Sequence, residues 1–313
     1  MARSTHLPRP PEPFVVEPKA VHTHTVVLLH GLGSNGEKFG KEFLDTGKTS
    51  SGMTLPQLFP GAKFIFPTSR RRRSTAFRRS MLTMWFDIIC LEDPSERKEL
   101  QVKGMSESAK DLLDLLRQEI ETSKIGPENI VLGGLSQGCA MSLSFLLCLD
   151  HPIGGFIGMS GYLPFREDLD EAMAELSDDD DSPFSGGDDA DDNLDPATKA
   201  SVFERDLLGL PSVDDSQGKT AQSTPIFLGH GGADEKVPCS LGEEMARTMQ
   251  TAGYMLRWRR YEGHGHWYKI PDEIDDIVEF FRQDMGWQEG YATAYSSLIL
   301  AADIPYYSKQ RIT

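Results

Sequence analysis

Short runs of apolar residues alternate along the chain with segments whose apolar residues recur at helical spacing. A run that is apolar at every position is typical of a parallel strand buried on both faces of a sheet. The short run 14–16 is expected to form an edge strand, and the alternating segment 255–261 a more exposed one. We predict buried strands at five further runs, residues 26–29, 63–66, 130–132, 155–159 and 225–228.

Helices are predicted between these strands. Segments 106–123, 241–251 and 272–284 carry apolar residues near the helical period, so each should present one apolar face. Segment 137–149 is almost wholly apolar or small, which is typical of a buried helix. The alternation of strands and helices predicts an α/β fold, in which a mostly parallel sheet carries helices on both faces.

Three segments depart from this alternation. Residues 1–13 are rich in proline and are expected to form a disordered N-terminal lead. Within the domain 14–285, residues 177–197 are too acidic to bury an apolar surface that offsets the cost of ordering them, so we expect a disordered insertion there. Residues 286–313 form a C-terminal extension with apolar and aromatic content, which we expect to pack on the domain or to serve as a dimer surface.

Charge is unevenly distributed along the chain. There are 48 acidic and 32 basic side chains, a net charge of −16, and nine aspartates lie between Leu176 and Pro196 without one basic residue. This balance argues against a nucleic acid as partner. The arginine-rich stretch 70–79 stands apart. It could be a solvated loop, bind an anionic headgroup or lipid surface, or pair with the chain's own aspartates at 178–192.

The location of the protein is also indicated by what its sequence lacks. No run of 18 apolar residues occurs, and the first residues lack the apolar segment of a secretory signal, so we expect no stable membrane insertion. The four cysteines show no spacing typical of a metal site, which indicates packed, reduced thiols. A cytoplasmic protein without a bound metal is the expectation.

The strongest chemical signal is Gly134-Leu135-Ser136-Gln137-Gly138, which follows a predicted strand and begins a predicted helix. The glycines of this G-x-S-x-G pattern permit a tight turn that holds the serine in a strained backbone conformation and exposes its hydroxyl. The helix N-terminus supplies backbone N–H donors for a developing oxyanion. Ser136 is therefore the candidate nucleophile, although a serine in an ordinary glycine-rich turn has the same local sequence.

A nucleophilic serine needs a base, and the base needs an acid that orients it. After a G-x-S-x-G serine, the acid comes first along the chain and the histidine second. Asp234 lies soon after the predicted strand 225–228, where ligand-facing groups are expected, and is the candidate acid. His264 and His266 both follow the predicted strand 255–261, and the order of the motifs does not separate them as candidate bases.

Two backbone N–H groups are candidates for an oxyanion hole. The segment His30-Gly31-Leu32-Gly33 follows the first buried strand, and its glycines let the main chain approach a substrate. The donors would be the N–H of Leu32 and the N–H of the residue after the serine, Gln137. His30 and His230 also lie at strand ends, where we expect them to hydrogen-bond loop backbone.

Five segments together resemble the phospholipase/carboxylesterase family of α/β-hydrolases, whose best-known members are acyl-protein thioesterases. Their joint occurrence in the family's order is far more specific than any one motif. The segments span most of residues 24–285 and are VVLLHGLG at 26–33, MWFDI at 84–88, GGLSQG at 133–138, HGGADEKVP at 230–238 and YEGHGH at 261–266.

This resemblance implies an α/β-hydrolase fold with Ser136 as nucleophile, Asp234 as acid and His266 as base. The family pattern Tyr-x-Gly-x-Gly-His places its histidine at 266 and leaves 264 variable. The comparison, rather than the spacing, thus favours His266 over His264.

Further roles follow from the same resemblance. Leu32 and Gln137 match the family's oxyanion-hole positions, and Trp85 and Phe86 match a segment that lines the mouth of the site. The chain departs from the family at Ser34, where aspartate is usual, and in the length of the segment between Gly161 and Pro225. These departures concern loops near the mouth, which set substrate specificity.

The resemblance implies a serine hydrolase that cleaves carboxylic esters or thioesters through an acyl-enzyme and needs no cofactor. Its substrate would be a lipidated protein, a lysophospholipid or a small ester, and a homodimer is one option for its assembly. One alternative is a non-catalytic homologue that binds a ligand or a protein. Another makes the acidic tract and the arginine-rich stretch a protein-interaction platform.

Overall fold

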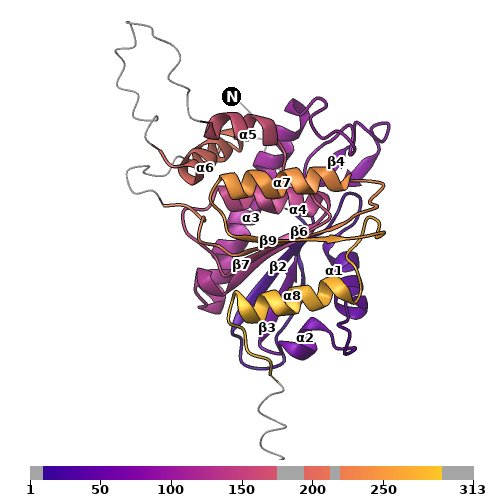
Figure 1. Cartoon of the computed structure of the whole chain (residues 1–313), viewed down its shortest axis with the longest axis vertical. Helices are drawn as coiled ribbons and strands as arrows, with labels where there is room; N and C mark the ends of the chain where they lie inside the picture. Colours follow the sequence, from indigo (N-terminus) through magenta and orange to yellow (C-terminus); the bar gives the residue numbers. More distant parts are fainter. Residues whose placement is uncertain (1–9, 175–193, 212–218, 291–313) are drawn as a thin grey trace, which may run out of the picture.

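One seven-stranded sheet lies between two layers of helices in the computed structural model, which describes residues 10–174, 194–211 and 219–290 (Figure 1). The strand order is β1-β3-β2-β6-β7-β8-β9; β1 is antiparallel to β3, and all other neighbours are parallel. The predicted α/β fold is confirmed. The strands are β1 (Phe14–Val16), β2 (His24–Leu29), β3 (Ala62–Phe66), β6 (Ile130–Leu135), β7 (Gly155–Met159), β8 (Ile226–Gly231) and β9 (Leu256–Tyr261).

The apolar runs of the central strands reflect burial on both faces of the sheet. In β2, Val26 and Leu28 pack in one apolar cluster, while Val27 and Leu29 pack in the cluster on the opposite face. Successive side chains of a strand point to opposite faces, so a strand covered by helices on both sides has to be apolar throughout. This is why continuous apolar runs predicted the central strands correctly.

The helices form two layers, which Figure 1 shows above and below the sheet. One layer contains α3 (Glu99–Ser123), α4 (Gln137–Leu147) and α7 (Cys239–Thr251), and α5 (Arg166–Met173) and α6 (Pro196–Leu207) pack against it. The other layer contains α1 (Gly36–Thr46), α2 (Leu55–Leu58) and α8 (Asp272–Gln283). A short 3-10 helix, Pro127–Asn129, precedes β6. In the described segments, no helix combines the length and the apolarity that crossing a bilayer requires.

Several elements lie outside the predicted set. Helix α3 begins seven residues earlier than predicted, and α1, α2, α5 and α6 were not predicted. In α1 the large buried side chains are Phe39 and Phe43, which lie one turn apart. Two apolar positions are too few to reveal a helical period in the sequence. The hairpin of β4 (Arg71–Arg73) and β5 (Met81–Thr83) was not predicted either, because its first strand consists of arginines.

The predicted insertion and the predicted C-terminal extension each need one adjustment. Asp195 lies within the predicted insertion 177–197 but caps α6, accepting the N–H groups of Ala197 and Thr198 at 3.0 and 3.1 Å. Trp287 lies in the predicted extension but is buried and stacks on Phe281 with ring centroids 4.4 Å apart. Most of the remainder of these segments, together with most of the predicted lead, falls in residues 1–9, 175–193 and 291–313, outside the described residues.

Candidate active site

Ser136 occupies a sharp turn between β6 and α4, at the edge where the parallel strands end. Its backbone has φ 57° and ψ −123°, a region that residues other than glycine rarely adopt. The glycines on either side permit this turn because a Cβ atom at Gly134 would lie 2.7 Å from the Leu29 carbonyl oxygen, and one at Gly138 only 2.2 Å from it. The predicted strained turn is thus present.

Ser136, His266 and Asp234 form one hydrogen-bonded chain. The loop after β9 places the His266 Nε2 3.0 Å from the Ser136 Oγ. The Nδ1 of the same ring lies 2.7 Å from the Asp234 Oδ2, on the loop after β8. This arrangement can take a proton from the serine hydroxyl while the carboxylate fixes the orientation of the ring.

The carboxylate of Asp234 is held in its charged form by its neighbours. Burial opposes that charge, yet hydrogen bonds from the rings of His230 and His266 and from the Val237 N–H outweigh it and keep the pKa of Asp234 below its usual range. His230 is a second partner of Asp234 that the sequence did not reveal. Its Nε2 lies 2.9 Å from the Val237 carbonyl oxygen and 3.3 Å from the Asp234 Oδ2.

The structure separates the two candidate histidines. The His264 Nε2 lies 3.0 Å from the carbonyl oxygen of Trp267, so this ring is bound to the backbone of its own loop. Only His266 of the two contacts both Ser136 and Asp234. The geometry therefore favours the base that the family resemblance implied.

Two backbone N–H groups near Ser136 in the chain or in space have no acceptor among the described residues. Gln137 is the first residue of α4, so its N–H has no partner within the helix. The loop after β2 lies against Ser136, because a Cβ atom at Gly31 would come within 3.4 Å of the Ser136 Cβ. The N–H of Leu32 in this loop has no acceptor among the described residues, which leaves it available to an oxyanion.

The buried His30 holds this loop in place. Its Nε2 accepts the N–H of Ser69 at 3.1 Å, and its Nδ1 lies 2.7 Å from the Gly31 carbonyl oxygen. Burial lowers the pKa of His30 to about 4, so at neutral pH the ring is uncharged and can accept a hydrogen bond. This is the loop-bonding role that the sequence analysis expected.

Trp85 and Phe86 are buried in the core, and neither is among the residues that line the cavity over Ser136. Their role at the mouth of the site stays a prediction. Their backbone grips the side chain of Gln137, whose Oε1 accepts the Trp85 N–H at 3.0 Å and whose Nε2 donates to the Phe86 carbonyl at 2.8 Å. The Trp85 Nε1 donates to the His30 carbonyl at 2.8 Å, so the segment ties the serine turn to the oxyanion loop.

A cavity of about 520 Å³ opens over Ser136 and His266. Apolar side chains form much of its wall, and the β4–β5 hairpin contributes Phe77 and Leu82. A mainly apolar cavity with a few polar groups is typical of a site for a small organic substrate. The other lining residues are Gly31, Leu32, Gly33, Ser34, Lys38, Phe39, Glu42, Leu91, Leu135, Lys236 and Trp267.

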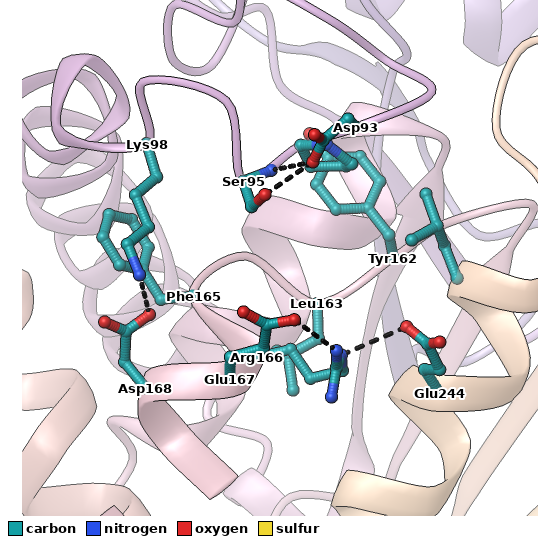
Figure 2. Close-up of a pocket in the computed structure, with 12 residues that line it drawn as sticks. Asp93, Ser95, Lys98, Tyr162, Leu163, Phe165, Arg166, Glu167, Asp168 and Glu244 are labelled. Carbon is teal, nitrogen blue, oxygen red and sulfur yellow. Dashed lines mark hydrogen bonds and ion pairs between the residues drawn. The ribbon is translucent and has the colours of Figure 1, made fainter. Parts of the chain in front are cut away.

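A second hollow of about 180 Å³ lies beside the loop after β7 (Figure 2). Figure 2 shows that its charged side chains are engaged with one another: Lys98 contacts Asp168, and Arg166 contacts Glu167 and Glu244. Because these charges are mutually satisfied, this hollow presents no activated group comparable to Ser136.

Two arginines of the arginine-rich stretch form ion pairs with α3. The guanidinium of Arg70 binds Asp111, and that of Arg72 binds Glu107, so both anchor the hairpin to α3. The proposed partners at 178–192 lie outside the described residues, and pairing with them stays a prediction. Across residues 10–174, 194–211 and 219–290, no group of three or more metal-ligating side chains occurs.

Known proteins share both the sequence pattern and the fold of this chain. A family model described as phospholipase/carboxylesterase matches residues 10–181, and one described as the prolyl oligopeptidase family matches residues 192–288. The chain is 28% identical over 276 residues to acyl-protein thioesterase 1 of Gibberella zeae, covering 87% of this chain and 95% of that one. It is 29% identical over 282 residues to acyl-protein thioesterase 1 of Cryptococcus neoformans, covering 86% and 95%.

Solved structures agree with these relatives. Zea mays acyl-protein thioesterase 2 superposes with a TM-score of 0.58 at 25% identity, covering 88% of this chain and 99% of that one. Arabidopsis thaliana SOBER1 superposes with a TM-score of 0.58 at 21% identity, covering 83% and 98%, which shows a common fold. The first family model alone covers more than half of the chain. The chain therefore belongs to the phospholipase/carboxylesterase family of α/β-hydrolases.

Proposed function

We propose that this serine hydrolase cleaves carboxylic esters or thioesters through an acyl-enzyme formed on Ser136. The observation that carries the proposal is the continuous hydrogen-bonded chain from the Ser136 Oγ through His266 to Asp234. As the oxygen attacks an acyl carbonyl, the His266 Nε2 accepts its proton, and the Asp234 carboxylate stabilises the charged ring.

The carbonyl oxygen becomes an oxyanion in this step, and we propose that the N–H groups of Leu32 and Gln137 bind it. Removing one such donor typically costs about 3 kcal/mol of barrier. When the tetrahedral intermediate collapses, the bond to the leaving oxygen or sulfur breaks and His266 returns its proton to that atom. Water then attacks the acyl carbonyl with His266 again as base, the bond between the acyl carbon and the Ser136 Oγ breaks, and His266 returns the proton to that oxygen. These steps need no metal or organic cofactor.

The substrate class follows from the relatives and from the cavity. Relatives named acyl-protein thioesterase support an S-acylated protein as substrate, and the family description supports lysophospholipids and simple carboxylic esters. The apolar wall of the cavity, which includes Leu82, Leu91 and Leu135, suits an acyl chain.

We further propose a cytoplasmic location and leave a homodimer as an option for assembly. All four cysteines are free, and three of them, Cys139, Cys148 and Cys239, are buried, which is consistent with a reducing compartment. Fractionation of the cells that make the protein tests the location, and sedimentation of the purified protein tests the dimer.

A fluorophosphonate probe tests the proposed chemistry directly, because it labels only activated serine nucleophiles. We expect mass spectrometry to find the label on Ser136 in the wild-type protein and no label in Ser136→Ala. Absence of label from folded wild-type protein would refute the proposal and favour a non-catalytic binding module.

A further inference from the structure

Two lysines stand at the rim of the cavity over Ser136. Lys38 comes from α1 and Lys236 from the loop between β8 and α7; both line the cavity and are exposed. In the described part of the chain, neither lysine has a carboxylate within ion-pair distance. Glu42 is the one carboxylate among the described lining residues, so the rim is cationic although the chain is strongly acidic.

The hairpin that forms another part of the wall is rich in arginine, although Arg71 and Arg73 lie on the face of the hairpin opposite to Leu82. It contributes Phe77 and Leu82 to the cavity, and four arginines of the same hairpin have no ion pair with any described residue. Phe77 is 50% exposed, so the edge of the cavity that it forms is open to solvent. The four residues are Arg71, Arg73, Arg78 and Arg79.

The inner part of the cavity has the opposite character. Phe39 is buried, and Leu91, Leu135 and Trp267 line the wall with it. An acyl chain gains most by lying against these side chains, because the burial of apolar surface favours it. The leaving group of the substrate would then lie on the open side of Ser136, among the cations.

We infer that the enzyme prefers esters or thioesters whose leaving group carries an anionic group, such as a carboxylate or a phosphate. The inference rests on the proposed function and identifies Lys38 and Lys236 as residues that determine specificity. Exposed ion pairs are weak, so each lysine should contribute about threefold to the preference, and both together about tenfold.

The test compares two aryl esters of one medium-chain fatty acid, a neutral p-nitrophenyl ester and its analogue with a carboxylate on the ring. The measured quantity is the ratio of kcat/KM for the anionic ester to kcat/KM for the neutral ester. The intrinsic reactivities of the two esters cancel when this ratio is compared between proteins. In the double variant Lys38→Gln, Lys236→Gln the ratio should fall by about tenfold.

A matched control lies on the same helix. Lys41 pairs with Glu37 and does not line the cavity, so Lys41→Gln should leave the ratio unchanged. Raising the salt concentration to about 1 M shortens the Debye length to about 3 Å and should reduce the wild-type ratio toward that of the double variant.

The outcomes separate this inference from the proposed function. An unchanged ratio in the double variant, or an equal fall in Lys41→Gln, would overturn the inference while hydrolysis of both esters upheld the proposed function. Hydrolysis of neither ester by the wild-type protein would refute both.

The anionic leaving group can belong to a small ester or to a lipid headgroup. The same ratio, measured for lysophosphatidylglycerol over lysophosphatidylcholine with one acyl chain, distinguishes these sources. A fall confined to the aryl esters identifies small anionic esters as the preferred class, whereas a fall with both pairs includes the headgroup.

Discussion

Replacement of Gln137 by leucine tests how the serine turn is tied to the oxyanion loop. The side chain of Gln137 is fully buried; it accepts the Trp85 N–H and donates to the Phe86 carbonyl. Leucine has a similar size but no polar atom, so both buried backbone groups would lose their partner. Each orphaned group costs about 1–3 kcal/mol, and the free energy of unfolding should therefore fall by roughly 2–6 kcal/mol.

Activity should fall as well, since the Trp85 indole also donates to the His30 carbonyl, two residues before the Leu32 N–H. Displacement of the Leu32 N–H would weaken one oxyanion contact. The expected loss in kcat is up to about 100-fold. Urea unfolding measures the first effect, and hydrolysis of a neutral aryl ester by the folded variant measures the second.

A second buried glutamine provides the matched control. Gln101 on α3 donates to the Pro94 carbonyl at 2.6 Å, and its Oε1 has no partner among the described residues. Gln101→Leu should therefore orphan one backbone group, cost at most about 1–3 kcal/mol, and keep its activity. The reasoning would be refuted if Gln137→Leu unfolded within about 1 kcal/mol of wild type, or if the two variants lost activity equally.

Other variants test the triad, one buried carboxyl and the end of the domain. Ser136→Ala and His266→Ala should each lower kcat by roughly four to six orders of magnitude with unchanged circular dichroism, whereas His264→Ala should keep most activity. An inactive His264→Ala together with an active His266→Ala would reverse the assignment of the base. Burial raises the pKa of Glu204 to about 8 from an ordinary value of 4.5. The folded state then retains a proton that the unfolded state has released, so this carboxyl lowers the folding equilibrium constant about tenfold per pH unit between these values. Glu204→Gln should remove this contribution and gain stability relative to wild type as the pH rises. An equal difference between variant and wild type in urea unfolding at about pH 5 and about pH 7 would contradict this. Trp287→Ala should cost about 3–5 kcal/mol of unfolding free energy in the same assay, and a cost below about 1 kcal/mol would show that the residue is not part of the core.

The sheet was predictable because its central strands are buried on both faces, which requires continuous apolar runs such as 26–29 and 225–228. Helix α1 was not predictable in this way, because its buried side is formed by two glycines and two phenylalanines within eleven residues. The β4–β5 hairpin was not predicted from the sequence for another reason. Arg70 and Arg72 look like surface charges in the sequence, and only the fold brings them to the carboxylates of α3.

At the site, local sequence identified Ser136 and Asp234 but could not separate His264 from His266. The two histidines have nearly the same neighbours in the sequence. What distinguishes them is the carbonyl of Trp267, which binds the ring of His264 in the folded loop. The contact of His230 with Asp234 also depends on loop geometry. Its sequence signal, a histidine four residues before the acid, was present but is too common to assign a role.

The packing of α5 against α6 has a consequence for how this chain can change its length. The two helices contact each other, so the exit of the chain from α5 at Met173 and its return to α6 at Pro196 are fixed by the folded body. The entropy cost of closing a loop between fixed ends rises by only about 0.6 kcal/mol for each doubling of its length. Evolution can therefore add or delete residues between these helices at little cost, and the same point is suited to grafting an epitope or a fluorescent reporter.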